Sequence, residues 1–223
     1  MLHVTRVGSG QPIVLTHGLG DDGRTWDAVA PILAVSHGVV TWDLRGHGQS
    51  IATPDTRYSR ELAIGDLDGV IDSIDTPVDL VGHSLGGYLS LAFALRHPGR
   101  VASLTMIASG PGYRDPEARA EWNRYVDVSA RKMPIPPEAS ALCHQGDSSV
   151  IDHVSELRAP LLLLVGDRDR RFHAGMAYMA DRVAGSVIVH IEGAGHHPQQ
   201  THPDVIAHHI DRHISRTREQ SET

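Results

Sequence analysis

The chain has 223 residues, of which 40% are hydrophobic, and its formal net charge is −7. This size and composition fit one globular domain with a sizeable core, and the negative charge argues against general nucleic-acid binding, which normally needs a basic face. The single cysteine, Cys143, excludes an intrachain disulfide and fits a reducing compartment. The chain opens almost directly into a strand-like segment, which leaves no room for a signal peptide, and its longest apolar run, 161–165, is too short to cross a bilayer. We therefore expect a cytoplasmic protein that binds neither nucleic acid nor membrane.

In chain order, the sequence alternates between short apolar runs and longer segments of helical periodicity. The short runs end at glycine or polar turns, which is typical of strands. They cover 2–7, 12–16, 39–42, 78–81, 101–107, 161–165 and 187–191. Apolar residues recur at helical intervals over 26–33, 60–74, 85–95, 116–129, 172–183 and 205–214. This alternation predicts an α/β fold whose mostly parallel sheet has about seven strands and is flanked by helices.

The alternation breaks between residues 110 and 157, where no strand is predicted. Asp115 as a cap and Pro116 at the first helical position indicate a helix start. An excursion from the sheet at this point predicts a small helical lid over the carboxyl ends of the strands, where open α/β sheets bind ligands. We expect one domain over 1–223 that carries this lid, and a charged tail from Ser215 that frays.

A Gly-x-Ser-x-Gly motif lies between the predicted strand at 78–81 and the helix that follows it. A strand that turns abruptly into a helix strains the residue at the turn, and only neighbours without side chains avoid a collision. Gly82 and Gly86 meet that need on either side of Ser84. The motif predicts a serine hydroxyl held at the tip of the sheet and at the positive end of a helix, as a nucleophile requires.

A nucleophilic serine needs a base to take its proton and an acid to orient that base. Asp167 and Asp169 follow the sixth predicted strand, and either carboxylate can supply the acid. His196 and His197 follow the seventh, and either imidazole can supply the base. The chain order Ser, Asp, His is the one expected when these groups follow successive strands of such a sheet.

Acyl transfer also needs two backbone donors for the oxyanion. Leu85, directly after the serine, offers one amide at the helix start. Leu19, after the turn His17-Gly18, offers the other. His17 is expected to hydrogen-bond within its own loop and shape this turn, and His83 is expected to pack and hydrogen-bond beneath Ser84.

With these residues assembled, the sequence resembles the α/β-hydrolase superfamily, in its esterase, enol-lactonase and meta-cleavage-hydrolase branch. Five motifs carry the resemblance: His17-Gly18, 43–50, 82–87, 166–169 and 193–196. The resemblance implies an esterase-like hydrolase without a metal or an organic cofactor. In this family the acid usually lies three residues after the glycine, which selects Asp169, and the base directly follows Gly-x-Gly, which selects His196. The family usually has eight strands, and this chain starts at the second.

Aromatic side chains are candidates for the substrate pocket, although core or lid packing suits them equally well. The candidates are Trp26, Tyr88, Tyr113, Trp122 and Phe172, together with His197 beside the expected base. Asp43 is expected to be an ion-pair partner in a loop, and Asp66 an exposed helix residue. Cys143 is expected to be a spectator thiol.

Sixteen histidines raise the question of a metal site. His209 and His213 share one predicted helix face next to His208, but no His-Glu-x-x-His motif is present. We interpret this region as a solvated helix on which metal binding would be adventitious.

The leading hypothesis is a serine hydrolase that cleaves a small carboxylic ester or lactone through an acyl-enzyme on Ser84. Its expected partner is a small-molecule acyl substrate, and the protein can be a monomer or a homodimer. In this superfamily the same residues also serve carbon–carbon bond hydrolases and a menaquinone-pathway lyase. The segment 166–172 is similar to that lyase, but this chain has Tyr88 where the lyase has arginine. A non-catalytic ligand receptor on the same fold is the alternative from another class.

Overall fold

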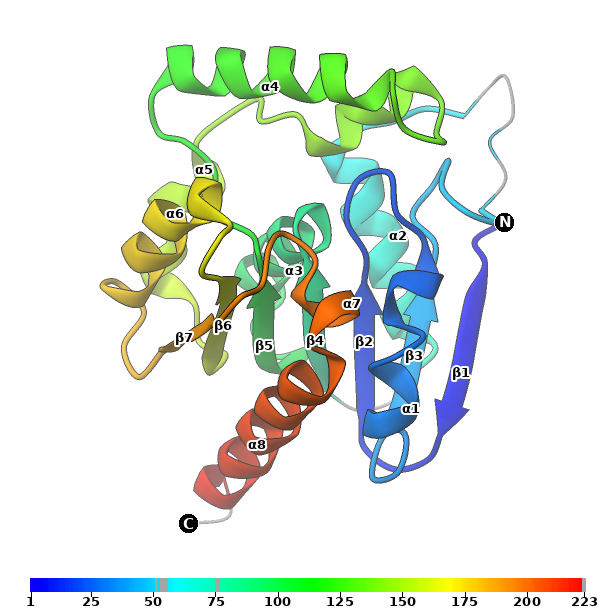
Figure 1. Cartoon of the computed structure of the whole chain (residues 1–223), viewed down its shortest axis with the longest axis vertical. Helices are drawn as coiled ribbons and strands as arrows, with labels where there is room; N and C mark the ends of the chain where they lie inside the picture. Colours follow the sequence, from blue (N-terminus) through cyan, green and yellow to red (C-terminus); the bar gives the residue numbers. More distant parts are fainter. Residues whose placement is uncertain (51, 53–55, 75–76, 222–223) are drawn as a thin grey trace.

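The computed structural model describes residues 1–50, 52, 56–74 and 77–221. Within them, seven strands form one sheet in the order β1-β3-β2-β4-β5-β6-β7 (Figure 1). Their bounds are β1 (Val4–Gly8), β2 (Pro12–Thr16), β3 (Gly38–Trp42), β4 (Val78–His83), β5 (Val101–Ile107), β6 (Leu161–Gly166) and β7 (Val187–Ile191). Only β1 runs antiparallel to its neighbour among these pairs. The predicted fold class is confirmed.

The helices follow the predicted segments, with two differences at the ends of the chain. They are α1 (Ala30–Leu33), α2 (Arg60–Asp72), α3 (Leu85–Arg96), α4 (Pro116–Ala130), α5 (Ser149–Asp152), α6 (Arg170–Ala180), α7 (Pro198–Thr201) and α8 (Pro203–Ser221), with 3-10 turns η1 (Gly23–Trp26), η2 (Pro137–Cys143) and η3 (Val154–Glu156). The helix expected over 26–33 is split between η1 and α1. The expected fraying from Ser215 is wrong, because α8 continues to Ser221 and Thr217 is buried, its hydroxyl donating to the His213 carbonyl.

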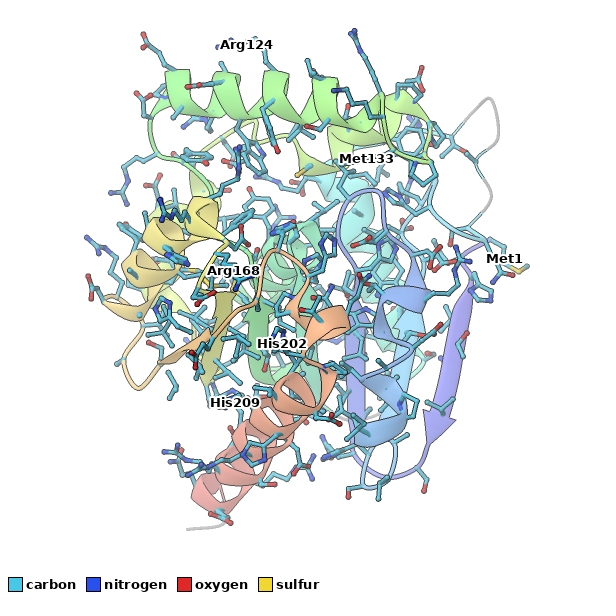
Figure 2. The ribbon with its side chains drawn as sticks, in the orientation of Figure 1. Met1, Arg124, Met133, Arg168, His202 and His209 are labelled. Atoms are coloured by element: carbon cyan, nitrogen blue, oxygen red, sulfur yellow. The ribbon has the colours of Figure 1, made fainter. Side chains whose placement is uncertain are left out.

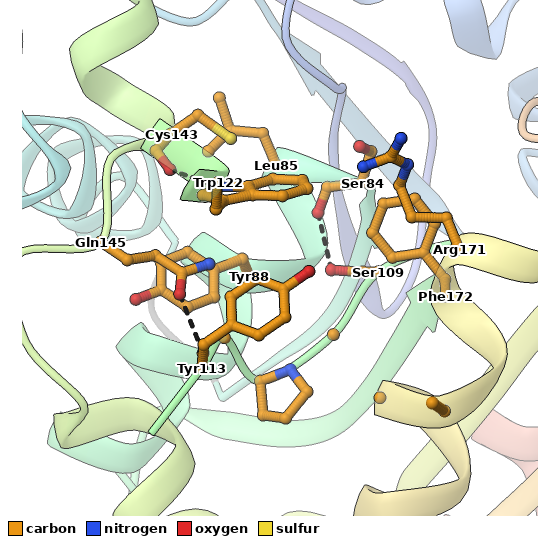
Figure 3. Close-up of a pocket in the computed structure, with 15 residues that line it drawn as sticks. Ser84, Leu85, Tyr88, Ser109, Tyr113, Trp122, Cys143, Gln145, Arg171 and Phe172 are labelled. Atoms are coloured by element: carbon orange, nitrogen blue, oxygen red, sulfur yellow. Dashed lines mark hydrogen bonds between the residues drawn. The ribbon is translucent and has the colours of Figure 1, made fainter. Parts of the chain in front are cut away.

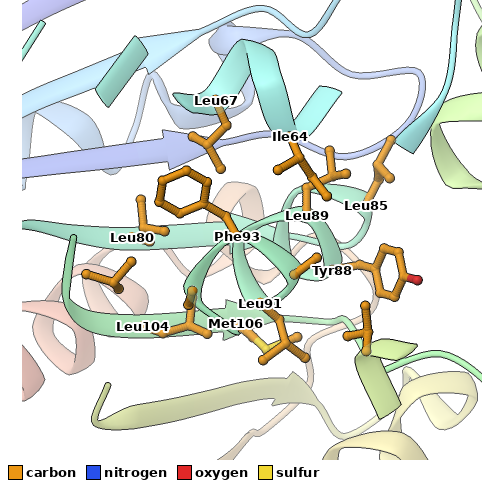
Figure 4. Close-up of a cluster of buried hydrophobic side chains, with 14 of the residues drawn as sticks. Ile64, Leu67, Leu80, Leu85, Tyr88, Leu89, Leu91, Phe93, Leu104 and Met106 are labelled. Atoms are coloured by element: carbon orange, nitrogen blue, oxygen red, sulfur yellow. The ribbon is translucent and has the colours of Figure 1, made fainter. Parts of the chain in front are cut away.

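The sheet is buried on both faces, as the two sets of side chains on β6 illustrate. Leu161, Leu163 and Val165 belong to a core cluster with α2 and α3 (Figure 4), whereas Leu162 and Leu164 belong to a second cluster with α1 and α8. Successive side chains of a strand point to opposite faces, so a strand covered on both sides reads as a continuous apolar run. Each fully buried leucine stabilises the fold by about 1.5–3 kcal/mol relative to exposure.

The carboxyl ends of the parallel strands meet at one edge of the sheet, and the segments that carry the predicted site all leave from it. Leu19 follows β2, Ser84 follows β4, Asp169 follows β6 and His196 follows β7. Residues 110–157 leave between β5 and β6, contain helices and 3-10 turns but no strand in this fully described range, and place α4 over that edge (Figure 1).

The segment 110–157 begins as its sequence predicts and rests on the loop after β2. The Asp115 carboxylate accepts a 2.8 Å hydrogen bond from the Ala118 amide, and Pro116 takes the first helical position. At the other end of α4, a Cβ at Gly20 would lie 2.7 Å from the Met133 sulfur. Figure 2 shows Met133 between α4 and the sheet edge, whereas Arg124 lies on the outer side of α4. The segment 110–157 therefore covers the edge of the sheet where Ser84 lies.

Two acidic residues outside the predicted site hold loops in place. Asp43, expected to be an ion-pair partner, accepts 2.7 Å hydrogen bonds from the Gly23 and Gln49 amides and lies 3.4 Å from a His3 ring nitrogen. Asp66, expected to be an exposed helix residue, instead pairs through both carboxylate oxygens with Arg45 at 2.6 Å and is only partly exposed. That expectation was wrong because helix periodicity does not show a loop arginine folding back onto α2.

No helix in the described residues combines the length and apolar character needed to span a membrane.

Candidate active site

Ser84 occupies a strained turn between β4 and α3. Its backbone angles are φ 50° and ψ −114°, a region that costs a non-glycine residue about 1–3 kcal/mol. A Cβ at Gly82 would lie 2.3 Å from the Gly86 carbonyl oxygen, and a Cβ at Gly86 would lie 2.2 Å from the Thr16 carbonyl oxygen. Only glycine fits at both positions. The Ser109 hydroxyl closes the turn by donating to the Ser84 carbonyl at 2.7 Å.

One continuous hydrogen-bond chain joins Ser84 to two residues that follow later strands. The Ser84 hydroxyl donates to His196 Nε2 at 3.1 Å, and His196 Nδ1–H donates to Asp169 Oδ2 at 2.7 Å. Asp167, the other carboxylate that spacing left open, is exposed. The hydrogen bonds thus join Ser84 to His196 and Asp169, the two positions that the family resemblance implies.

Two further contacts hold the His196 ring and backbone. His83 Nε2–H donates to the His196 carbonyl at 2.8 Å. The Phe172 ring stacks on the His196 ring, with centroids 4.9 Å apart and an interplanar angle of 15°. Burial lowers the pKa of His83 to about 4, because the apolar surroundings disfavour its cation. His83 is therefore neutral at pH 7, with its single proton on Nε2.

The two amides predicted for an oxyanion belong to two segments that both lie next to Ser84. Leu85 is the first residue of α3, where the amide has no acceptor within the helix. Leu19 belongs to the loop that passes directly over the serine, because a Cβ at Gly18 would lie 3.2 Å from Ser84 Cβ. His17 fixes this loop: its Nδ1–H donates to the Gly18 carbonyl at 2.7 Å, while its Nε2 accepts from the Leu44 amide at 2.9 Å.

Two cavities share Ser84 in their walls. The smaller, of about 120 Å³, extends from Ser84 and Leu85 towards Tyr88, Tyr113 and Gln145 (Figure 3). The larger, of about 340 Å³, holds His196, Asp169 and Leu19 in its walls. Both are lined by Ser84, Trp122, Cys143, Arg171 and Phe172. Ser84 therefore borders both cavities.

The structure brings five of the six predicted pocket residues to these cavities. They are Tyr88, Tyr113, Trp122, Phe172 and His197. The prediction for Trp26 is wrong. Its side chain is 0% exposed and packs with Val29 and Leu33 in the second core cluster, because η1 lies on the α1–α8 face of the sheet and not at its carboxyl edge.

Sequence reasoning missed Arg171, whose guanidinium lies 4.1 Å over the Tyr125 ring. Arg171 lines both cavities, and within the described residues no carboxylate forms an ion pair with it. Its position two residues after Asp169 was the available signal. Ser109 and Asp21 were also missed, and no local pattern marks either of them.

Histidine and carboxylate groups also gather beside Ser84, His196 and Asp169, the three hydrogen-bonded residues that are called the triad below. Within the described residues, Asp21, His83 and His197 form a group whose ligand atoms all lie within 4.8 Å of one another. Burial disfavours the charged form of Asp21, but His197 and His83 outweigh it and hold the pKa of Asp21 below its ordinary value. The Asp21 carboxylate in turn raises the pKa of His197. These residues sit in the wall of the larger cavity.

Comparison with known proteins gives one family. Residues 11–134 match the family model described as the alpha/beta hydrolase fold. Over 106 residues the chain is 38% identical to 2-hydroxymuconate semialdehyde hydrolase from Pseudomonas sp. (strain CF600), which covers 46% of this chain and 38% of that protein. Over 119 residues it is 35% identical to pimeloyl-[acyl-carrier protein] methyl ester esterase from Aeromonas hydrophila, covering 53% and 44%. The matched region spans about two fifths of the length of these relatives.

Among solved structures, a thermophilic esterase from Thermogutta terrifontis with malate bound is similar over almost the whole chain. The TM-score is 0.85 at 26% sequence identity, and the match covers 97% of this chain and 93% of that one. The likeness therefore includes β6, β7 and the segments after them, which the family match over 11–134 does not reach.

Proposed function

The chain belongs to the α/β-hydrolase-fold family, and from that premise we propose that it is a serine hydrolase that cleaves a small carboxylic ester or lactone through an acyl-enzyme on Ser84. The observation that carries the proposal is the hydrogen-bond chain from Ser84 Oγ through His196 to Asp169. Relatives named as hydrolases and esterases support the reaction class. We also propose that residues 1–223 form one domain in which 110–157 act as a lid.

The first half of the reaction forms the acyl-enzyme. His196 Nε2 takes the proton of Ser84 Oγ as the oxygen attacks the substrate carbonyl carbon. The Leu19 and Leu85 amides donate to the oxygen that becomes negative in the tetrahedral intermediate. Asp169 holds the proton on Nδ1, so that Nε2 is free to act as a base, and balances the imidazolium that forms. When the carbon–oxygen bond breaks, the imidazolium returns its proton to the leaving alcohol.

The second half releases the acid. A water gives its proton to His196 Nε2 and its oxygen attacks the acyl carbonyl. The intermediate collapses with the proton passing to Ser84 Oγ, which restores the free serine. The stacked Phe172 ring and the bond from His83 to the His196 carbonyl keep the imidazole in place through both halves.

The two cavities suggest how the substrate is oriented. The leaving alcohol must receive its proton from His196, and His196 lines the larger cavity but not the smaller one. We therefore assign the alcohol to the larger cavity. The acyl group then extends past Leu85 into the smaller cavity, whose volume of about 120 Å³ suits a short chain.

A series of p-nitrophenyl esters with increasing acyl length tests this proposal. We expect turnover that is highest for short acyl chains and is abolished by Ser84→Ala. Ser90→Ala is the matched control, because Ser90 is a fully buried serine of α3 whose hydroxyl has no hydrogen-bond partner. Equal turnover by Ser84→Ala and the native protein, or no turnover of any ester, would contradict the proposal.

A second candidate, hydrolysis of a carbon–carbon bond in a carboxylate-bearing substrate, is favoured by Arg171. An unpaired guanidinium beside the nucleophile is suited to a carboxylate. The relative named 2-hydroxymuconate semialdehyde hydrolase supplies an assay substrate. We expect Arg171→Met to raise KM for carboxylate-bearing substrates and to leave KM for neutral esters unchanged. Faster cleavage of the semialdehyde than of any ester would favour this candidate over the first.

A further inference from the structure

Asp21, His83 and His197 form a second polar cluster beside the triad, and three separate segments contribute to it. Asp21 lies in the loop after β2, His83 is the last residue of β4, and His197 follows β7. Asp21 Oδ2 lies 3.5 Å from His83 Nδ1 and 3.3 Å from His197 Nε2. Both separations are longer than a normal N–H···O bond.

The hydrogen-bond pattern leaves two acceptor atoms of this cluster without a donor. His83 Nε2 donates to a carbonyl, which can only accept, so the neutral imidazole presents a lone pair on Nδ1. That nitrogen has no partner, although the His83 side chain is only 1% exposed. Asp21 Oδ2 is likewise buried and unpartnered. Two acceptors that face each other in a protein wall need a hydrogen-bond donor or a cation between them.

We propose that Asp21, His83 and His197 bind a divalent transition-metal cation, with Zn²⁺ as its representative. A tetrahedral zinc with bonds of about 2.0–2.1 Å holds its ligand atoms about 3.3–3.4 Å apart. The two separations from Asp21 Oδ2, 3.5 and 3.3 Å, are close to this value, and all three ligand atoms lie within 4.8 Å of one another. Two imidazoles and one carboxylate favour zinc over magnesium or calcium, which prefer ligand sets of oxygen alone.

The surroundings of the cluster fit such a site. His83 has its other ring nitrogen bonded to a backbone carbonyl, the outer contact that metal-binding histidines commonly make. All three ligands line the larger cavity, which gives the ion an entry path and leaves a fourth position for water or a ligand. The carbonyl in question belongs to His196, so the bound cation would also stiffen the backbone of the proposed base.

Zinc binding to the native protein and to Ser84→Ala, measured by calorimetry, tests the site without reference to activity. We expect both proteins to bind a single equivalent, and Co²⁺ in its place to give the visible absorption of four-coordinate cobalt. Asp21→Asn and His197→Gln, which keep shape and fold, should each weaken binding at least tenfold. His83 is left intact in this test because it is buried beneath Ser84.

The double variant His208→Ala/His209→Ala is the matched control, because it removes adjacent imidazoles from α8 that the sequence marks as adventitious ligands. It should bind zinc as the native protein does. The proposal is overturned if the native protein binds no equivalent, if Asp21→Asn and His197→Gln bind as tightly as it does, or if the α8 variant loses the binding. If Ser84→Ala binds zinc as the native protein does, zinc binding does not depend on the proposed hydrolysis.

Discussion

His196 and His197 are consecutive residues in the wall of one cavity, yet they belong to networks of opposite kinds. Both ring nitrogens of His196 have hydrogen-bond partners, at 3.1 and 2.7 Å. His197 and its neighbour His83 instead lie 3.3 and 3.5 Å from Asp21 Oδ2, an atom without a hydrogen-bond partner. A fully satisfied network fixes where each proton lies, as general-base catalysis requires, whereas an incomplete one keeps the capacity to bind something else.

Substituting each of the two adjacent histidines separately should show the difference between the two networks most clearly. We expect His196→Gln to lower kcat by on the order of 10⁴-fold, since nothing else at the site can accept the serine proton. His197→Gln should change kcat by less than about threefold, because His197 does not contact Ser84. The measurement is kcat on the best p-nitrophenyl ester, and similar losses in both variants would refute the distinction.

The hydrogen-bond chain from Ser84 through His196 to Asp169 depends on the strained turn that holds Ser84. Gly86→Ala should destabilise the protein by about 3 kcal/mol, because its Cβ would lie 2.2 Å from the Thr16 carbonyl oxygen. Gly65→Ala is the matched control: it lies inside α2 with no atom within 4 Å of the added Cβ, and should stabilise by about 0.5–1 kcal/mol. Urea unfolding measures both values, and equal free energies of unfolding would contradict the packing account.

The stacking of Phe172 on the proposed base should have a smaller effect on kcat. Phe172→Leu removes a stacked ring that contacts His196. Such a contact is worth about 0.5–1.5 kcal/mol, so kcat should fall by about threefold to tenfold with KM nearly unchanged. A change confined to KM would assign Phe172 to substrate binding alone and not to positioning of the base.

The smallest expected effect is that of Asp21→Asn on hydrolysis in metal-free buffer. Within the described residues, Asp21 forms no hydrogen bond or ion pair with Ser84 or Asp169, so kcat should stay within about threefold of the native value. Steady-state kinetics after treatment with a chelator provides the measurement. A loss comparable to that of His196→Gln would place Asp21 in the proton-transfer network.

Some of this architecture follows from the sequence because it depends on local physics. The strands at 12–16, 101–107 and 187–191 have the predicted bounds, since apolar runs between turns leave little choice of register. The turn at Ser84 is equally local, because glycine is required on both sides of it. Asp169 and His196 follow from spacing combined with the family resemblance.

Other features depend on contacts between segments that are distant in sequence. Trp26 was assigned to the pocket although it lies in the core, because an aromatic residue suits both settings. Arg171 and Asp21 reach the cavity through the way α6 and the loop after β2 are placed, and only the position of Arg171 two residues after Asp169 gives any sign of it. The cluster of Asp21, His83 and His197 needs three strand ends to meet, so it was not visible in the sequence.

The central claim is that Ser84 is an activated nucleophile, and covalent labelling with a fluorophosphonate followed by peptide mass spectrometry tests it most directly. We predict a single adduct on the peptide that contains Ser84, which is lost in Ser84→Ala, strongly slowed in His196→Gln and retained in Ser90→Ala. A native protein that stays unlabelled would instead indicate a ligand receptor on this fold, and an adduct on another residue would contradict the assignment of Ser84.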